Sequence, residues 1–341
     1  MSLSDLAVIT SDANALARDL VRLSAGRGKG RFANHLLLEG SRMIHTALDC
    51  GVVPQLLILP LPDDFIGKAD GTAAQPVRRY VAAGSAVDAL LERLSGDVAE
   101  SSNVASSAEL NDATSGTDSS NAASGCSAES GDVANGGGSG QPATTAIFMS
   151  APLYRKLGSL ESPADCLAVV EQPALPKLGE EDAAIWRGGT LEPVLVLEEV
   201  QDPTNVGAMI RTADALGCRL VIGIGGAKPL SAKCVRASMG SAFALPIATA
   251  GSSGEALGYL RERSCANIAA AATGEACDEV TYDFPAALWI GNEGRGLSAQ
   301  VLREADLTVK IPMEGSAESL NAAAAAAILL WQLRSALRAR G

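Results

Sequence analysis

The sequence is poor in several kinds of residue, and each shortage excludes a class of protein. Aromatic residues make up 4% of the 341 residues, and the only histidines are His35 and His45. The seven cysteines are odd in number and include no C-x-x-C pair, so they predict neither a disulfide framework nor a zinc site. No apolar run reaches the roughly 20 residues that span a bilayer, and the N-terminus lacks a signal-peptide pattern. We therefore expect a cytoplasmic protein that binds neither metal nor membrane.

Basic residues are in the minority, with 27 Lys and Arg against 39 Asp and Glu. The net charge of -12 argues against a nucleic-acid partner, because phosphate binding requires cations. The distribution of charge points the other way. Residues 95–145 hold seven acidic residues and no Lys or Arg, whereas residues 18–42 hold six basic residues against two acidic ones. The second segment is therefore a candidate surface for phosphate.

Composition and periodicity divide the chain into two α/β parts. Residues 1–30 predict a helix over 3–24 followed by a basic lead-in, and a smaller domain is expected over 31–172. Its stretch at 95–145 consists mainly of small and polar residues, which bury too little apolar surface to order the chain, so we expect a disordered insertion there. A linker at 173–192 contains several prolines and precedes the second domain.

The second domain, 193–341, alternates short apolar strands with helices. Strands that are apolar throughout are typical of a parallel sheet covered on both faces, so we expect a mostly parallel α/β fold. The strands are expected at 194–197, 219–224, 244–247, 268–272, 287–290 and 307–311, and the helices at 205–216, 232–239, 255–263 and 320–339.

Three loops of the second domain carry patterns typical of a ligand site. The first, 205–211, places Gly207 one turn before Arg211, which predicts a bare surface where a polymer backbone could approach. The second, 291–296, has three glycines after a strand, so a ligand could approach its backbone closely. The third, 311–321, runs into six consecutive alanines. Taken singly, the first loop is more typical of an ordinary capped helix and the second of an ordinary turn, while the third is also consistent with a buried small-residue helix or a dimer interface.

Together these loops resemble the SpoU group of the SPOUT methyltransferase superfamily. The family patterns N-x-G-x-x-x-R, G-x-E-G-x-G and I-P-M-x-G-x-x-x-S-L-N occur at 205–211, 291–296 and 311–321, in the family's order. The resemblance covers about residue 194 to the C-terminus. It implies a parallel-sheet SPOUT domain with a trefoil knot, a homodimer, and transfer of a methyl group from S-adenosylmethionine to a ribose 2'-OH of RNA, with ribosomal RNA of the 23S type favoured.

The first part of the chain is similar to the family's substrate-binding domain, which is of the L30e and L7Ae type. The matching segments are 31–40 and 160–171. The family usually has Gln-Gly after the proline at 163, whereas this chain has Ala164 and Asp165. The resemblance therefore implies a small α/β RNA-binding domain whose detailed substrate contacts differ from those of the family.

The resemblance assigns roles to individual residues. The implied catalytic residues are Asn205, Arg211, Glu293, Ser319 and Asn321. The implied cofactor-binding residues are Thr273, Ile290, Gly291, Ile311, Met313 and Leu320. Within the basic segment, the residues expected to contact RNA phosphates are Arg27, Lys29, Arg31 and Arg42.

The proton of the ribose hydroxyl has no histidine acceptor in the second domain, because both histidines lie before it. The family gives the key role to the residue at Arg211, either as base or as a positioner beside an RNA phosphate. A guanidinium stays protonated in proteins, which favours a bidentate phosphate clamp. Two other functions stay open: the same chemistry on transfer RNA, and a non-catalytic RNA-binding or ribosome-assembly protein. The complete set of motif residues argues against the latter.

Overall fold

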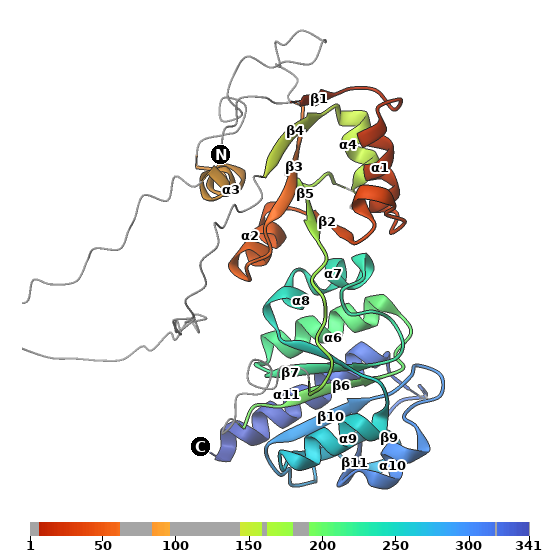
Figure 1. Ribbon diagram of the computed structural model, residues 1–341. Coiled ribbons are helices and arrows are strands. Elements are labelled where there is room, and N and C mark those ends of the chain that lie inside the picture. Colours follow the sequence, from red (N-terminus) through yellow and green to blue (C-terminus); the bar gives the residue numbers. More distant parts are fainter. Residues whose placement is uncertain are drawn as a thin grey trace, which may run out of the picture.

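The computed structural model describes residues 7–61, 84–95, 144–158, 162–179, 191–317 and 319–340. Nearly all of the predicted insertion and the middle of the predicted linker lie outside these residues. Figure 1 shows the described elements as two α/β units, with the earlier unit stacked on the later one. The expected α/β class with two sheets is confirmed, while the residue boundaries of the domains stay predictions.

The first unit is built on a five-stranded mixed sheet in the order β1-β4-β3-β5-β2. Its strands are β1 (Ala7–Ile9), β2 (His35–Glu39), β3 (Pro54–Pro60), β4 (Thr145–Met149) and β5 (Leu167–Glu171). Its helices are α1 (Ala15–Ser24), α2 (Ser41–Asp49), α3 (Ala86–Ser95) and α4 (Ala151–Leu157). Buried side chains of α1 and α4 pack on one face of the sheet, and those of α2 and α3 pack on the other.

The helix predicted over 3–24 is wrong at its beginning. Ala7–Ile9 forms strand β1, which pairs in parallel with β4. The β-branched Val8 and Ile9 suit a strand better than a helix. Helix α1 begins after Asn14, whose side chain accepts hydrogen bonds from two backbone N–H groups of the first turn. The cap therefore sets the start of this helix, and residues 1–6 lie outside the described chain.

The second unit contains a six-stranded sheet, parallel throughout, in the order β11-β9-β10-β6-β7-β8. Its strands are β6 (Val194–Glu198), β7 (Leu220–Ile224), β8 (Ile247–Ala250), β9 (Ala266–Ala276), β10 (Ala286–Ile290) and β11 (Leu307–Lys310). Its helices are α6 (Pro203–Ala215), α7 (Ala232–Ser238), α8 (Ser241–Ala244), α9 (Ser253–Glu262), α10 (Ala299–Glu304) and α11 (Ala322–Arg340). The parallel sheet predicted from the apolar strands is confirmed.

Helices cover both faces of this sheet. Buried side chains of α9 and α10 pack on one face, and those of α6, α7 and α11 pack on the other. The short helices α8 and α10 are absent from the sequence prediction, and the strand expected at 244–247 lies at Ile247–Ala250 instead. The trefoil knot stays a prediction of the resemblance. No helix in the described ranges combines the length and the hydropathy needed to cross a membrane.

The two units are joined by a packed interface with a buried ion pair. Helix α7 packs against β2, and α8 packs against α2. Arg236 of α7 donates to Glu39 of β2 at 3.0 Å, and the Glu39 side chain is only 2% exposed. Gly240, between α7 and α8, lies so close to Thr46 that a Cβ there would approach the threonine methyl to 3.3 Å. These contacts fix how the first unit sits on the second.

Candidate active site

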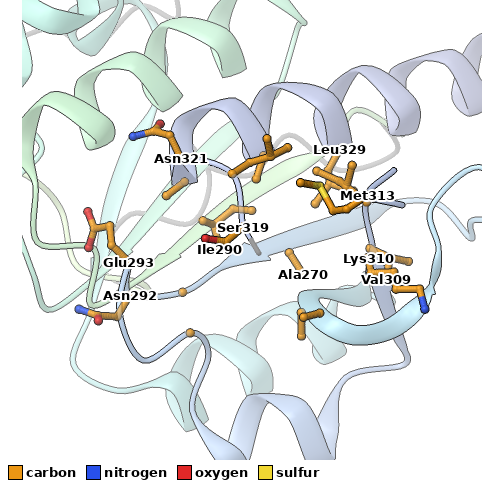
Figure 2. Close-up of a pocket in the computed structure, with 18 of the residues that line it drawn as sticks. Ala270, Ile290, Asn292, Glu293, Val309, Lys310, Met313, Ser319, Asn321 and Leu329 are labelled. Carbon is orange, nitrogen blue, oxygen red and sulfur yellow. The ribbon is translucent and has the colours of Figure 1, made fainter. Parts of the chain in front are cut away.

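A cavity of about 710 Å³ opens where β10 and β11 end, beside the middle of β9. Its walls are the segments 270–272, 290–296, 309–313 and 319–322 together with one side of α11. Figure 2 shows Glu293 and Asn321 at one end of the cavity, and Lys310 and Met313 at the other. Crevices at the carboxyl ends of parallel strands are the usual ligand sites of open α/β sheets, and this volume suits a cofactor-sized molecule.

The turn after β10 forms one wall with its backbone. A Cβ on Gly291 would lie 2.3 Å from the carbonyl carbon of Gly296 and 2.4 Å from the nitrogen of Leu297, so only glycine fits there. Asn292 and Gly296 close the turn by exchanging two backbone hydrogen bonds of 3.1 and 2.8 Å. This wall of the cavity is therefore formed by main-chain atoms rather than by bulky side chains, which matches the sequence expectation for this loop.

Glu293 ties the second loop to the segment that precedes α6. Its carboxylate accepts hydrogen bonds from the backbone N–H groups of Gln201 and Asp202, each at 3.0 Å, and from the amide of Asn205 at 3.1 Å. Asn321 then donates to Asn205 at 3.0 Å. One residue from each of the three predicted loops thus takes part in a single chain of hydrogen bonds at the mouth of the cavity.

This network lowers the pKa of Glu293. Partial burial alone would raise the pKa, but the hydrogen bonds from Gln201, Asp202 and Asn205 favour the ionised form and bring the pKa from its ordinary 4.5 to about 2. Glu293 is therefore an ionised acceptor that positions the loop, rather than a proton carrier at neutral pH.

Most of the predicted cofactor residues line this cavity, and Ser319 and Asn321 line it with them. The cofactor residues that do so are Ile290, Gly291, Ile311, Met313 and Leu320. Thr273 is exposed and is not among the lining residues; the three alanines before it on β9 take that place. At this point of the strand the cavity wall is formed by very small side chains.

Arg211 is exposed on α6 and is not among the lining residues of its own chain. Helical geometry places it roughly 120° around the helix from Asn205. The expectation that Gly207 leaves a bare surface beside Arg211 is wrong. Gly207 is buried against α7, where a Cβ would lie 2.5 Å from the Cβ of Ala237. This glycine allows two helices to pack closely.

The four predicted RNA contacts are all exposed, but they lie on two sides of the first sheet. Arg27, Lys29 and Arg31 follow α1 on one face, whereas Arg42 belongs to α2 on the other. The single basic segment of the sequence is therefore divided by strand β2.

Sequence reasoning missed several lining residues, among them Ala270 on β9, Lys310 at the end of β11 and Leu329 on α11. The alanines at 270–272 end a predicted strand, and small side chains at the carboxyl end of a parallel strand were the available signal. Leu329 gave no such signal, because an apolar residue in a helix is typical of an ordinary hydrophobic core. Among the described residues, no group of three or more His, Cys, Asp or Glu could hold a metal ion.

Comparison with known proteins identifies the family. Residues 192–331 match the SpoU rRNA Methylase family. The chain is 35% identical over 192 residues to the 23S rRNA (guanosine(2553)-2'-O)-methyltransferase RlmP of Bacillus subtilis, and the match covers 55% of this chain and 71% of the relative. The chain belongs to the SpoU rRNA methylase family. It is also 39% identical over 197 residues to the 23S rRNA (uridine(2479)-2'-O)-methyltransferase of Streptomyces viridochromogenes, covering 55% of this chain and 67% of that enzyme.

A solved SpoU structure extends the likeness to nearly the whole chain. The crystal structure of the SpoU methyltransferase AviRb from Streptomyces viridochromogenes, in complex with the cofactor AdoMet, matches with a TM-score of 0.64 and 25% identity. The match covers 96% of this chain and all of AviRb. Family membership confirms the resemblance drawn from the three loops, and the SPOUT fold of the second unit with it.

Proposed function

We propose that this SpoU family member transfers a methyl group from S-adenosylmethionine to a ribose 2'-OH of large-subunit ribosomal RNA. The observation that carries the proposal is the cavity in which the second and third family motifs meet, joined to the first motif through Glu293, Asn205 and Asn321. Two 23S rRNA 2'-O-methyltransferases among the relatives support the substrate. We infer a cytoplasmic location from this proposed substrate.

The residues of the cavity fit the proposed cofactor. Backbone groups of Gly291, Ile311 and Leu320 would hold the adenosine part, because main-chain donors and acceptors recognise an adenine edge and the glycine turn admits close approach. The side chains of Met313 and Leu320 stand 40% and 39% exposed at the cavity, where an apolar ligand surface would cover them. When bound, S-adenosylmethionine supplies the electrophilic methyl group.

The protein's own contribution is to position the acceptor. Asn205 and Asn321 hold the mouth of the cavity in one geometry, and Ser319 faces the same space as a hydrogen-bond donor. Glu293 stays ionised and orients the loop before α6. Arg211 clamps an RNA phosphate next to the target ribose, since a guanidinium recognises phosphate bidentately and keeps its proton. Holding the hydroxyl in line with the methyl group lowers the entropic part of the barrier.

The position of Arg211 favours a homodimer in which the site is shared between subunits. Arg211 is exposed outside the cavity of its own chain, and we infer that a second subunit brings this residue to the reacting atoms. Helix α11 presents Trp331 and Ile328 with 54% and 42% of their surface exposed. Large apolar side chains exposed beside each other are typical of subunit interfaces, and a second copy of this chain would cover them.

The proposal is tested by incubating the full chain with S-adenosylmethionine carrying a labelled methyl group and one purified RNA at a time. We expect label in unmethylated 23S rRNA, and an Arg211→Ala variant with unchanged cofactor affinity should incorporate at least about a hundredfold less, the usual scale for losing a transition-state contact. Label in transfer RNA alone would favour the alternative substrate. Label in no RNA, with cofactor bound, would favour a non-catalytic RNA-binding protein and contradict the proposal.

A further inference from the structure

The first unit carries an exposed basic face that the sequence pattern only partly predicts. It consists of α1, the loop after it and α4. Its basic residues, all exposed, are Arg18, Arg22, Arg27, Lys29, Arg31, Arg155 and Lys156. Only Asp12 and Asp19 oppose them in residues 11–32 and 151–158. A chain of net charge -12 thus concentrates seven cations on one small surface.

The two helices of this face lie side by side although about 130 residues separate them in the sequence. Helix α4 packs against α1, and both bury their apolar side chains in the same cluster on one face of the sheet. Figure 1 shows them next to each other along that face. Lys156 reaches Asp12, just before α1, at 2.7 Å. Arg155 and Lys156 therefore belong to the same surface as the cations after α1.

The loop after α1 is held in a fixed shape. The backbone N–H of Arg27 donates to the carbonyl of Arg22 at 2.8 Å. A Cβ on Gly28 would lie 2.2 Å from the carbonyl oxygen of Phe32, so the loop folds tightly back on itself. Arg27 and Lys29 form no ion pair with any residue in the described ranges. These two cations are presented to solvent by an ordered backbone, which lowers the entropic cost of binding an anion.

The opposite face of the sheet offers no comparable surface. Helices α2 and α3 contain two basic and three acidic residues, so this face has no excess of positive charge. The N-terminus of α2 is also occupied, because Asp165 accepts hydrogen bonds from the backbone N–H and the hydroxyl of Ser41 at 2.9 and 2.5 Å. A phosphate at this helix end would meet a carboxylate, so Arg42 lies on a face unsuited to RNA.

The basic face lacks exposed aromatic rings in α1, the loop after it and α4. Unpaired bases are usually bound by stacking on exposed aromatic rings. The aromatic residues of α1, the following loop and α4 are Phe32 and Tyr154, which are 6% and 2% exposed. This surface therefore offers charge without stacking platforms, which suits the regularly spaced phosphates of a double helix.

We propose that this basic face binds the phosphate backbone of a double-helical RNA segment, with Arg155 and Lys156 as contacts and Arg42 outside the interface. The inference rests on the RNA substrate proposed above and names the surface that holds it. The face anchors the substrate at a distance from the cavity, so it contributes affinity rather than chemistry.

The test compares two double variants of the full chain that each remove two positive charges. Arg155→Gln with Lys156→Gln changes the basic face, and Arg42→Gln with Arg93→Gln changes the opposite face as the matched control. Binding of a fluorescent double-helical RNA oligomer of mixed sequence is measured by anisotropy across a series of salt concentrations. Thermal unfolding and cofactor affinity check that both variants keep the native fold.

We expect the α4 variant to bind the duplex about tenfold more weakly at low salt, with a slope of log affinity against log salt that is smaller by about 0.9 for each lost phosphate contact. The control should bind like the parent protein. Equal weakening in both variants, an unchanged α4 variant, or a single strand of the same length that displaces the duplex would each overturn the proposal. The experiment measures RNA affinity and not methyl transfer. It therefore tests the basic face even if no RNA accepts a methyl group.

Discussion

Glu293 organises the mouth of the cavity through its charge, and that charge makes the organisation depend on pH. The pKa of its carboxyl is lowered from 4.5 to about 2 in the folded protein, so ionised Glu293 stabilises the fold fully above about pH 4.5. The stabilisation is lost as the pH falls from there toward 2. In Glu293→Gln, an amide N–H would face the backbone N–H donors of Gln201 or Asp202 at any pH.

We therefore expect the free energy of unfolding of the parent protein to exceed that of Glu293→Gln at pH 7, and the difference to shrink steadily below about pH 4.5. Denaturant unfolding of both proteins at several pH values measures it. A difference that stays constant down to pH 3 would show that the hydrogen bonds to ionised Glu293 do not hold the loop.

The sequence indicates which residues belong to a site, but it does not indicate in which direction each side chain points. The first motif contains both Asn205 and Arg211, yet only Asn205 reaches the network at the cavity. Helix α6 begins at Pro203, with Asp202 as the cap that accepts from Thr204 at 2.8 Å. This start sets the rotation of every later side chain around the helix axis. A motif pattern alone fixes neither the cap nor the neighbouring helix that buries Gly207.

The turn between β10 and α10 offers a pair of glycines with opposite surroundings. A Cβ on Gly291 would collide with backbone atoms of Gly296 and Leu297, whereas on Gly294 it would meet only the Asn292 side chain at 3.7 Å. We expect Gly291→Ala to weaken S-adenosylmethionine binding at least about tenfold, or about 1.4 kcal/mol, because the turn must shift. Gly294→Ala is the control and should bind nearly as the parent protein does. Calorimetric titration measures both; similar affinities would show that the turn does not shape the cavity.

Helices and strands with a clear hydrophobic periodicity or a continuous apolar run were predictable from the sequence. Short helices and strands were not. The parallel strands of the second sheet follow from apolar runs such as residues 194–197, and helix α11 follows from a helix-forming pattern that continues for about 20 residues. Strand β1 has three residues and α10 has six, so neither carries enough pattern to stand out. Both form because tertiary partners stabilise them: β1 pairs with β4, and α10 buries Val301 against the sheet.

The packing of the two units against each other could not be predicted, because it depends on pairs of contacting residues that are distant in sequence. Glu39 and Arg236 are 197 residues apart, and each alone reads as a charged surface residue. In the folded chain Glu39 is buried and paired, and its removal would leave Arg236 without this carboxylate in a largely apolar interface. The ion pair thus belongs to the docking of the first unit on the second.

A shared active site can be tested on the whole assembly by mixing two inactive variants. If Arg211 of one subunit serves the cavity that contains Asn321 of the other, a hybrid of Arg211→Ala and Asn321→Ala contains one intact site. We expect each variant alone to be inactive and the mixture, after subunit exchange, to recover up to about a quarter of the parent activity if subunits pair at random. Mixtures that stay inactive while hybrid dimers are detected would place both residues in the same subunit.

The central claim is that the cavity delivers a methyl group to a ribose oxygen of RNA. The most direct measurement is mass spectrometry of nucleosides from 23S rRNA treated with the full chain and S-adenosylmethionine. The account predicts a single new 2'-O-methylnucleoside, with the added methyl on the ribose fragment and an unmodified base, and its absence with Asn321→Ala. A methyl group found on a base, or 23S rRNA left unmodified by a protein that binds the cofactor, would contradict it.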